Sequence, residues 1–208
     1  LKEAVYDESK ILTLSSLEHI RLRPGMYIGR LGNGSHPSDG IYVLLKEIVD
    51  NSIDEFIMGH GRRIDIRINN GSVNIRDFGR GIPLGKVVEC VSIINTGAKY
   101  NDDVFQFSVG LNGVGTKAVN ALSENFEVIS YREKKMLSAC FKSGEIETKP
   151  LTQDTNESNG TKICFTPDTK IFPNYNYDIG TIRKQLWNYA YLNRKLTITL
   201  NGEKFKSE

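Results

Sequence analysis

The stretch from Leu44 to Ile57, LLKEIVDNSIDEFI, constrains the fold of this chain more than any other. At 100° per residue its apolar residues fall on one side, as in an amphipathic helix that buries one stripe. The stripe consists of Leu45, Val49, Ile53 and Phe56, and the polar side opposite it consists of Glu47, Asp50, Asn51 and Asp54. Like charges one turn apart destabilise an exposed helix by roughly a few tenths of a kcal/mol per pair. The polar side is therefore either a solvated acidic face or part of a site that binds a cation and a phosphate ligand.

Alternation of apolar and polar residues predicts that a series of β-strands follows this helix in the chain. Residues 62–69 and 72–77 alternate with a period of two around an Asn70-Gly71 turn, which is the pattern of a β-hairpin. Further strands are expected at 126–132, 136–142, 145–149, 161–167, 196–200 and 203–206. Further helices are expected at 17–23, 87–94, 116–122 and 179–192, with a tight turn at 24–29 and loops at 96–115 and 151–159.

This order of elements predicts an α+β fold. We expect one sheet of about eight mostly antiparallel strands with helices packed on one face. Asp39 is expected to be the N-cap of the long helix and Gly59 its C′ residue. An extended arm at residues 1–14 should precede one large domain at 15–208, which we expect to be a fragment of a longer protein.

Composition narrows the classes of function. The chain has 208 residues, a net charge of +2 and three cysteines, Cys90, Cys140 and Cys164, without a CxxC pair. So weak a charge argues against nucleic acid or an anionic membrane as a direct partner of this segment. No apolar run approaches the roughly 20 residues of a membrane span. The odd number of thiols and the lack of a signal-peptide pattern favour a reducing cytoplasm over a disulfide scaffold or a zinc site.

A second polar cluster follows the predicted hairpin, in the sequence DFGRGIP at residues 77–83. Asp77 ends a strand, and Gly79 and Gly81 follow two residues apart. Glycines allow a flat ligand to approach the backbone closely, while the carboxylate accepts a hydrogen bond from a ligand N–H. The alternative is an Asx turn that only stabilises the exit from the strand.

A third cluster, GLNGVG at residues 110–115, leads directly into a predicted helix. Backbone N–H groups at such a helix start form a site for phosphate. The segment is not a Walker A loop, because Thr116-Lys117 follows Gly115 where Gly-Lys-Ser/Thr would be required. It is not a Rossmann fingerprint either, because no parallel βαβ unit surrounds it. The three clusters together suit adenine, a triphosphate and magnesium, for which the amide oxygen of Asn51 is a suitable ligand.

With RLRPGMYIG at 21–29, EIVDNSIDE at 47–55, DFGRGIP and GLNGVGTKAVNALS at 110–123, the chain resembles the ATPase domains of bacterial type II topoisomerase B subunits, gyrase B and topoisomerase IV. The last three segments alone mark the wider superfamily (GHKL) of gyrase, heat-shock chaperone, histidine-kinase and mismatch-repair ATPases. The resemblance extends from about Tyr6 to the final hairpin. It implies a Bergerat-type sandwich that binds ATP and Mg²⁺.

The resemblance also implies roles for single residues. Glu47 would be the general base that polarises the attacking water, and Asn51 the magnesium ligand. Asp77 would accept from the adenine amino group through an ordered water. The residues beside it in the adenine pocket would be Gly79, Arg80, Gly81, Ile82, Pro83, Arg132 and Thr161.

Phosphate contacts and dimer contacts are implied in the same way. Lys99 and the segment made of Gly110, Leu111, Asn112, Gly113, Val114 and Gly115 would hold the phosphates, with residues 96–115 as a lid. Tyr6 and Ile11 would reach the nucleotide of a second copy of the chain. The sequence departs from the family pattern GGLHGVG at Val109 and Asn112, and a tyrosine common in the lid is replaced by Phe105.

The partners implied are a second copy of the chain, and a topoisomerase A-type subunit and DNA that would be contacted through domains outside this segment. An ATP-competitive inhibitor could bind against Asp77. A domain that supplies a lysine to the γ-phosphate is expected beyond Glu208. The sequence does not separate gyrase from topoisomerase IV.

Two alternatives belong to other functional classes. One is a nucleotide-gated interaction clamp of the mismatch-repair or chaperone type, which lacks the RLRPGMYIG segment. The other is a histidine-kinase catalytic domain, which needs a phospho-accepting histidine upstream. His19, His36 and His60 are not placed for that role.

Overall fold

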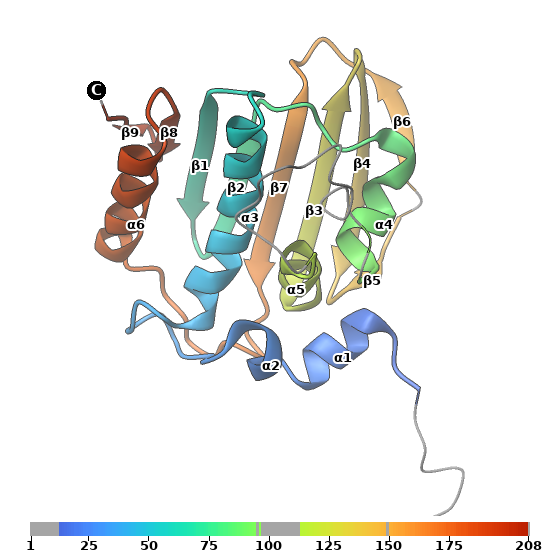
Figure 1. The fold of residues 1–208 in the computed structure, drawn as a ribbon. Helices are drawn as coiled ribbons and strands as arrows, with labels where there is room; N and C mark the ends of the chain where they lie inside the picture. The colour runs from blue at the N-terminus through green and yellow to red at the C-terminus, as the bar shows by residue number, and fades with distance from the viewer. Residues whose placement is uncertain (1–12, 95, 97–112, 149, 208) are drawn as a thin grey trace, which may run out of the picture.

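A computed structural model describes residues 13–94, 96, 113–148 and 150–207. Its described strands form one sheet of nine in the order β5-β4-β3-β7-β2-β1-β8-β9, and β6 pairs with β4 (Figure 1). They are β1 Arg63–Asn69, β2 Ser72–Asp77, β3 Ser123–Arg132, β4 Lys135–Lys142, β5 Glu145–Ile146, β6 Leu151–Asp154, β7 Gly160–Pro167, β8 Thr197–Leu200 and β9 Glu203–Phe205. Among these pairs only β1 with β8 is parallel. The predicted α+β fold with a mostly antiparallel sheet is confirmed.

The helices of the described residues are α1 Ser16–Leu22, α2 Gly25–Ile28, α3 Gly40–Ile57, α4 Val87–Ser92, α5 Gly115–Ala121 and α6 Ile179–Leu192, with a 3₁₀ turn, η2, at Leu84–Lys86. Figure 1 shows α3, α4, α5 and α6 over one face of the sheet, with α1 and α2 at its lower end. None of these helices is both long and apolar enough to cross a bilayer.

The β1–β2 hairpin forms because its turn suits the twist of the strands. Asn70 and Gly71 have φ angles of 49° and 79°, the left-handed values that a two-residue hairpin turn needs. The register pairs Ile66 with Ile75, so the buried side chains of both strands point to the same face. That face lies beneath α3.

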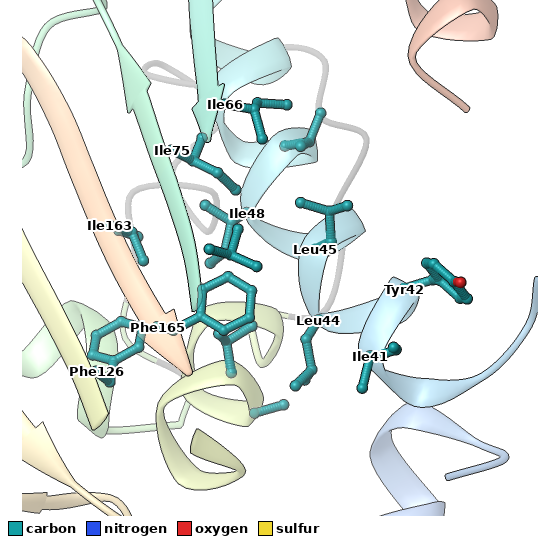
Figure 2. Packing of buried hydrophobic residues seen from close by; sticks show 14 of the residues in the cluster. Ile41, Tyr42, Leu44, Leu45, Ile48, Ile66, Ile75, Phe126, Ile163 and Phe165 are labelled. Carbon is teal, nitrogen blue, oxygen red and sulfur yellow. The ribbon is translucent and has the colours of Figure 1, made fainter. Parts of the chain in front are cut away.

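The core lies between α3 and the middle of the sheet. Figure 2 shows Ile48 of α3 next to Ile75 of β2 and Phe165 of β7, all of them buried. Complete burial of one such side chain contributes about 1.5–3 kcal/mol. This packing fixes α3 against the sheet beside β2, the strand that ends at Asp77.

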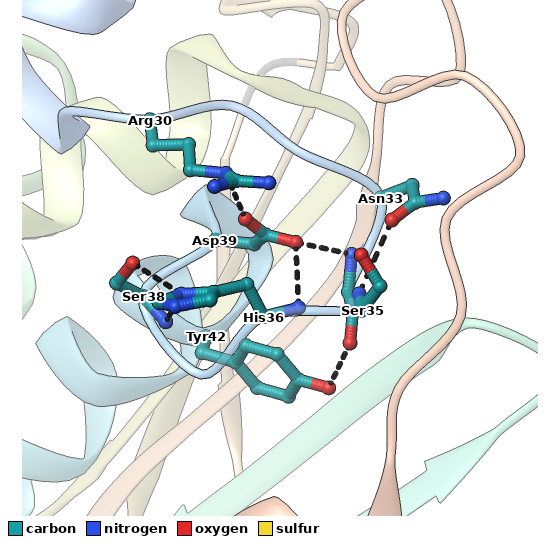
Figure 3. A network of polar contacts seen from close by, with 8 residues as sticks. Arg30, Asn33, Ser35, His36, Ser38, Asp39 and Tyr42 are labelled. Atoms are coloured by element: carbon teal, nitrogen blue, oxygen red, sulfur yellow. Dashed lines mark hydrogen bonds and ion pairs between the residues drawn. The ribbon is translucent and has the colours of Figure 1, made fainter.

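The start of α3 is held by a buried carboxylate that does not cap the helix. Asp39 is the N-cap residue, as predicted, but its side chain makes no capping hydrogen bond. It accepts instead from the backbone N–H groups of Gly34 (2.9 Å) and His36 (3.1 Å) and pairs with Arg30 at 2.7 Å (Figure 3). A Cβ on Gly32 would lie 2.0 Å from the Asp39 Cγ, so only glycine fits there. Gly59 follows the C-cap with φ +86°, as predicted for C′.

Three local predictions were wrong. Residues 151–154, expected in a loop, form the edge strand β6, and the strand expected at 145–149 is only β5. All four side chains of β6 are exposed, so they carry no alternating pattern; pairing with residues 135–138 of β4 makes the strand. Residues 25–28, expected in a turn, form α2.

Candidate active site

Two polar side chains of α3 meet the first turn of α5. A Cβ on Gly115 would lie 1.9 Å from Oε2 of Glu47, so the carboxylate lies directly against the start of α5. One turn further along α3, the Nδ2 of Asn51 donates to the Oγ1 of Thr116 at 2.8 Å. The structure thus places the end of the predicted glycine-rich phosphate segment on the polar side of α3.

The other two carboxylates of the predicted acidic face are buried. Asp50 and Asp54 are only 2% and 1% exposed. Asp50 pairs with Lys46 at 2.5 Å and accepts from the hydroxyl of Tyr189 on α6. Burial and this hydrogen bond raise the pKa of Tyr189. A solvated acidic face is therefore wrong for these two carboxylates. Asp50 contacts α6 and not the start of α5, and Lys46, at i−4 from Asp50, was the missed signal.

Asp77 ends β2 as predicted, and its carboxylate is buried. Its Oδ1 accepts from the backbone N–H groups of Gly79 (2.9 Å) and Thr161 (3.1 Å). The first of these bonds is the Asx turn that the sequence left open, and the second ties the turn to β7. Both described hydrogen bonds go to Oδ1, so the turn does not require Oδ2. Burial raises the pKa of this carboxyl to about 6, although the two N–H donors lower it.

This raised pKa predicts how stability depends on pH. The folded protein holds the Asp77 proton up to about pH 6, whereas the unfolded chain releases it near 3.9. The stabilisation from the protonated form is therefore complete below pH 4 and is lost as the pH rises through 6. Asparagine does not titrate. We expect the unfolding free energy of Asp77→Asn, relative to the wild type, to increase by roughly 3 kcal/mol between pH 4 and 8.

Urea denaturation of both proteins across this range measures the difference directly, because titrations shared by the two proteins cancel. A difference that stays flat with pH would show that the buried carboxyl has an ordinary pKa.

The two glycines after Asp77 are required by neighbouring parts of the protein. A Cβ on Gly79 would lie 2.8 Å from the side chain of Glu55. Gly81 has φ +76°, and a Cβ there would lie 2.4 Å from the carbonyl oxygen of Tyr131. The turn is therefore held tightly between α3 and β3.

Arg80 is fixed by a partner that the sequence pattern did not single out. Its guanidinium makes two hydrogen bonds to the carboxylate of Glu55 on α3, at 2.8 and 3.1 Å, and its backbone N–H donates to the same carboxylate at 2.9 Å. Two charge-assisted bonds of this kind fix the direction of the guanidinium. Glu55 lies four residues after Asn51 and eight after Glu47, so the i+4 spacing was the signal available in the sequence.

Residues of β3 contact the last part of the turn at 77–83, which was predicted to belong to the adenine pocket. Arg132 donates to the carbonyl oxygen of Gly81 at 3.1 Å. Ser130 donates to that of Ile82 at 2.6 Å. Pro83 precedes η2. The first of these contacts places Arg132 against the turn at 77–83. Its role beside adenine stays a prediction.

The glycine-rich segment is described only in its last part. Gly113 has φ +60°, and Val114 precedes α5. Inside α5, the Nζ of Lys117 donates to the carbonyl oxygen of Thr96 at 2.6 Å. The predictions for Tyr6, Ile11, Lys99, Phe105, Val109, Gly110, Leu111 and Asn112 lie outside the described residues.

Comparison with known proteins identifies this arrangement. Residues 36–171 match the family described as histidine kinase-, DNA gyrase B- and HSP90-like ATPases. The chain is 58% identical to the B subunit of DNA topoisomerase IV from Borreliella burgdorferi, over the whole chain and 35% of that protein. It is 38% identical to the B subunit of DNA gyrase from Clostridium acetobutylicum, over 98% of the chain and 32% of that protein. The chain thus spans about a third of these curated relatives.

A solved structure is similar as well. The 43K ATPase domain of Thermus thermophilus gyrase B, in complex with an aminocoumarin, superposes with a TM-score of 0.75 at 32% identity. The match covers 92% of this chain and 50% of that one.

Proposed function

Since this chain belongs to the family of histidine kinase-, DNA gyrase B- and HSP90-like ATPases, we propose that it is the domain that binds and hydrolyses ATP in the B subunit of a bacterial type II topoisomerase. The observation that carries this proposal is that α3 contacts two of the predicted ligand segments. Glu47 and Asn51 contact the start of α5, and Glu55, one turn further along α3, binds Arg80 of the Asp77 turn. The similarity to the B subunits of topoisomerase IV and gyrase supports it over nearly all of the chain.

The residues present suit an adenine nucleotide. Asp77 is a buried carboxylate whose Oδ1 is occupied by the turn, so Oδ2 is the atom that would accept a hydrogen bond from adenine, directly or through a water. Arg80 and Arg132 are held at the same turn by Glu55 and Gly81, and would border the base. The backbone N–H of Thr161 donates to the Asp77 carboxylate and so helps to position it.

The residues also suit magnesium, which prefers oxygen ligands and retains several waters. Asn51 would supply its amide oxygen, because its nitrogen donates to Thr116. When bound, the metal supplies positive charge that stabilises the phosphate oxygens during transfer. Glu47, next to Gly115, would accept the proton of the water that attacks the γ-phosphate. The roles of Lys99 and of Gly110 to Asn112 in holding the phosphates stay predictions.

The proposal for the complete protein goes further. Two copies of the domain at 15–208 would dimerise when ATP binds, with the arm at 1–14 reaching the nucleotide of the other copy. Hydrolysis would gate the passage of DNA together with an A-type subunit. The Thermus thermophilus ATPase domain was solved in complex with an aminocoumarin, which supports the proposal that an inhibitor could bind this domain.

We predict that the 208-residue chain binds ATP but hydrolyses it slowly. Phosphoryl transfer depends on positioning and charge, and the expected γ-phosphate lysine and the partner copy are outside this chain. Isothermal titration with a non-hydrolysable ATP analogue and Mg²⁺ measures binding, and release of phosphate measures turnover. A lack of binding would contradict the nucleotide site. Turnover as fast as that of the complete protein would contradict the need for further parts.

A DNA relaxation assay distinguishes a topoisomerase subunit from a nucleotide-gated interaction clamp. The B subunit of a topoisomerase, together with its A-type partner, changes the linking number of DNA when ATP is added, whereas a clamp of the same family binds nucleotide without this activity. The assay uses the complete protein, with Glu47→Gln as the control for dependence on hydrolysis.

A further inference from the structure

We infer that Thr116 is a positioning residue that orients the amide of Asn51, so that the amide oxygen faces the metal and phosphates of the nucleotide. The inference rests on the proposed function, because Asn51 is taken there as the magnesium ligand. Thr116 is expected to touch neither nucleotide nor metal. Its effect would be transmitted only through the hydrogen bond from Asn51 Nδ2 to Thr116 Oγ1, which is 2.8 Å long.

The two ends of an asparagine amide have opposite chemistry. The oxygen accepts hydrogen bonds and ligates cations, whereas the NH₂ group only donates and would repel a metal ion. An asparagine can present either end to a ligand by turning its amide through half a rotation. A hydroxyl that accepts from the nitrogen stabilises the rotamer that directs the oxygen elsewhere.

The hydroxyl is carried by an element that is itself fixed. Lys117 donates to the carbonyl oxygen of Thr96 at 2.6 Å, and Asn120 donates to that of Val91 at 2.9 Å. Ala118 and Val119 are buried in the core. The first turn of α5 therefore cannot shift easily, and Thr116 presents its hydroxyl to Asn51 from a rigid support.

The start of α5 contacts both of the α3 residues to which the proposed function gives a role. Gly115 lies against the carboxylate of Glu47, and Thr116 against the amide of Asn51. Residues one apart on α5 thus contact residues one turn apart on α3. A side chain at the first of these positions would displace the Glu47 carboxylate, and the second position provides a hydrogen-bond acceptor.

The test compares Thr116→Val, which has nearly the same shape but no hydroxyl, with Thr116→Ser, which keeps it. Binding of a non-hydrolysable ATP analogue is titrated by calorimetry, first in EDTA and then over a series of Mg²⁺ concentrations. Thr152→Val, on the exposed edge strand β6, is the matched control. Thermal melting of each variant shows that it is folded.

We expect all variants to bind the analogue equally in EDTA. In Thr116→Val the Mg²⁺ concentration that gives half of the metal-dependent gain in affinity should rise about 2- to 10-fold, which corresponds to the loss of one hydrogen bond. Thr116→Ser and Thr152→Val should match the wild type. Thr116→Ala, which keeps the helix and also lacks the hydroxyl, should repeat the valine result if the valine variant melts early.

Three results would overturn the inference alone. They are an unchanged Mg²⁺ requirement in both variants without the hydroxyl, a serine variant that behaves like valine, and a loss of affinity in valine and alanine that is as large in EDTA as in Mg²⁺. The last would show that Thr116 supports the pocket as a whole. A wild type that fails to bind the analogue would instead refute the proposed function, and the inference with it.

Discussion

Glu47→Gln is expected to lower the rate at which the complete protein hydrolyses ATP, roughly 10²- to 10⁴-fold, the usual contribution of a general base. Glutamine has nearly the same shape, so it can keep its place against Gly115, which leaves no room for a Cβ. It cannot accept a proton from water. Binding of a non-hydrolysable ATP analogue should therefore stay within about twofold of the wild type, as for a group that acts only in the transition state.

Single-turnover hydrolysis and calorimetry on the same preparation separate these two effects. Glu145→Gln, an exposed residue of β5, is the matched control and should change neither. If Glu47→Gln hydrolyses ATP within a few-fold of the wild-type rate, Glu47 is not the base. If it loses affinity as strongly as it loses rate, its role is to hold the nucleotide.

Asp77→Asn is expected to weaken binding of the ATP analogue by about 1.5–3 kcal/mol, or roughly 10- to 150-fold. An asparagine can still accept from Gly79 and Thr161 through its oxygen, so the turn should persist. The atom in place of Oδ2 becomes an NH₂ donor, which opposes the adenine amino group instead of accepting from it.

The same substitution is expected to stabilise the protein without nucleotide above pH 6, because it removes a buried carboxylate whose pKa is raised to about 6. Affinity and stability should therefore change in opposite directions, which a general disturbance of the fold would not produce. Asp154→Asn, exposed on β6, is the control for calorimetry and melting. Equal binding by wild type and Asp77→Asn would reduce Asp77 to a turn residue and displace adenine from this pocket.

The local pattern of the sequence was sufficient for the elements that carry the site. The period of α3, the Asn70-Gly71 turn and the strand that ends at Asp77 were all predicted and are confirmed. Helical period and left-handed turns are set by residues close in sequence, so a single sequence specifies them. The three clusters that led to the family were found for the same reason.

The contacts of individual side chains could not be predicted from the local sequence pattern. Asp50 was placed with Glu47 and Asn51, yet it lies in a closed pairing with Lys46 and Tyr189, the latter 139 residues away. The pairing of Glu55 with Arg80 was not foreseen either, although both lie in segments that were singled out. The strand β6 has no buried side chain, and only its pairing with β4 reveals it.

The sequence by itself determined α3, the β1–β2 hairpin and the strand that ends at Asp77, and which family the chain belongs to, because these depend on short-range spacing and on residue types. Only the tertiary structure decided which side of α3 faces α5 and which side α6 covers. The helical period places polar residues on a face, but it does not say what packs against that face. That choice depends on the burial of side chains from distant segments, and it separates Glu47 and Asn51, which contact α5, from Asp50, which pairs with Lys46 and Tyr189.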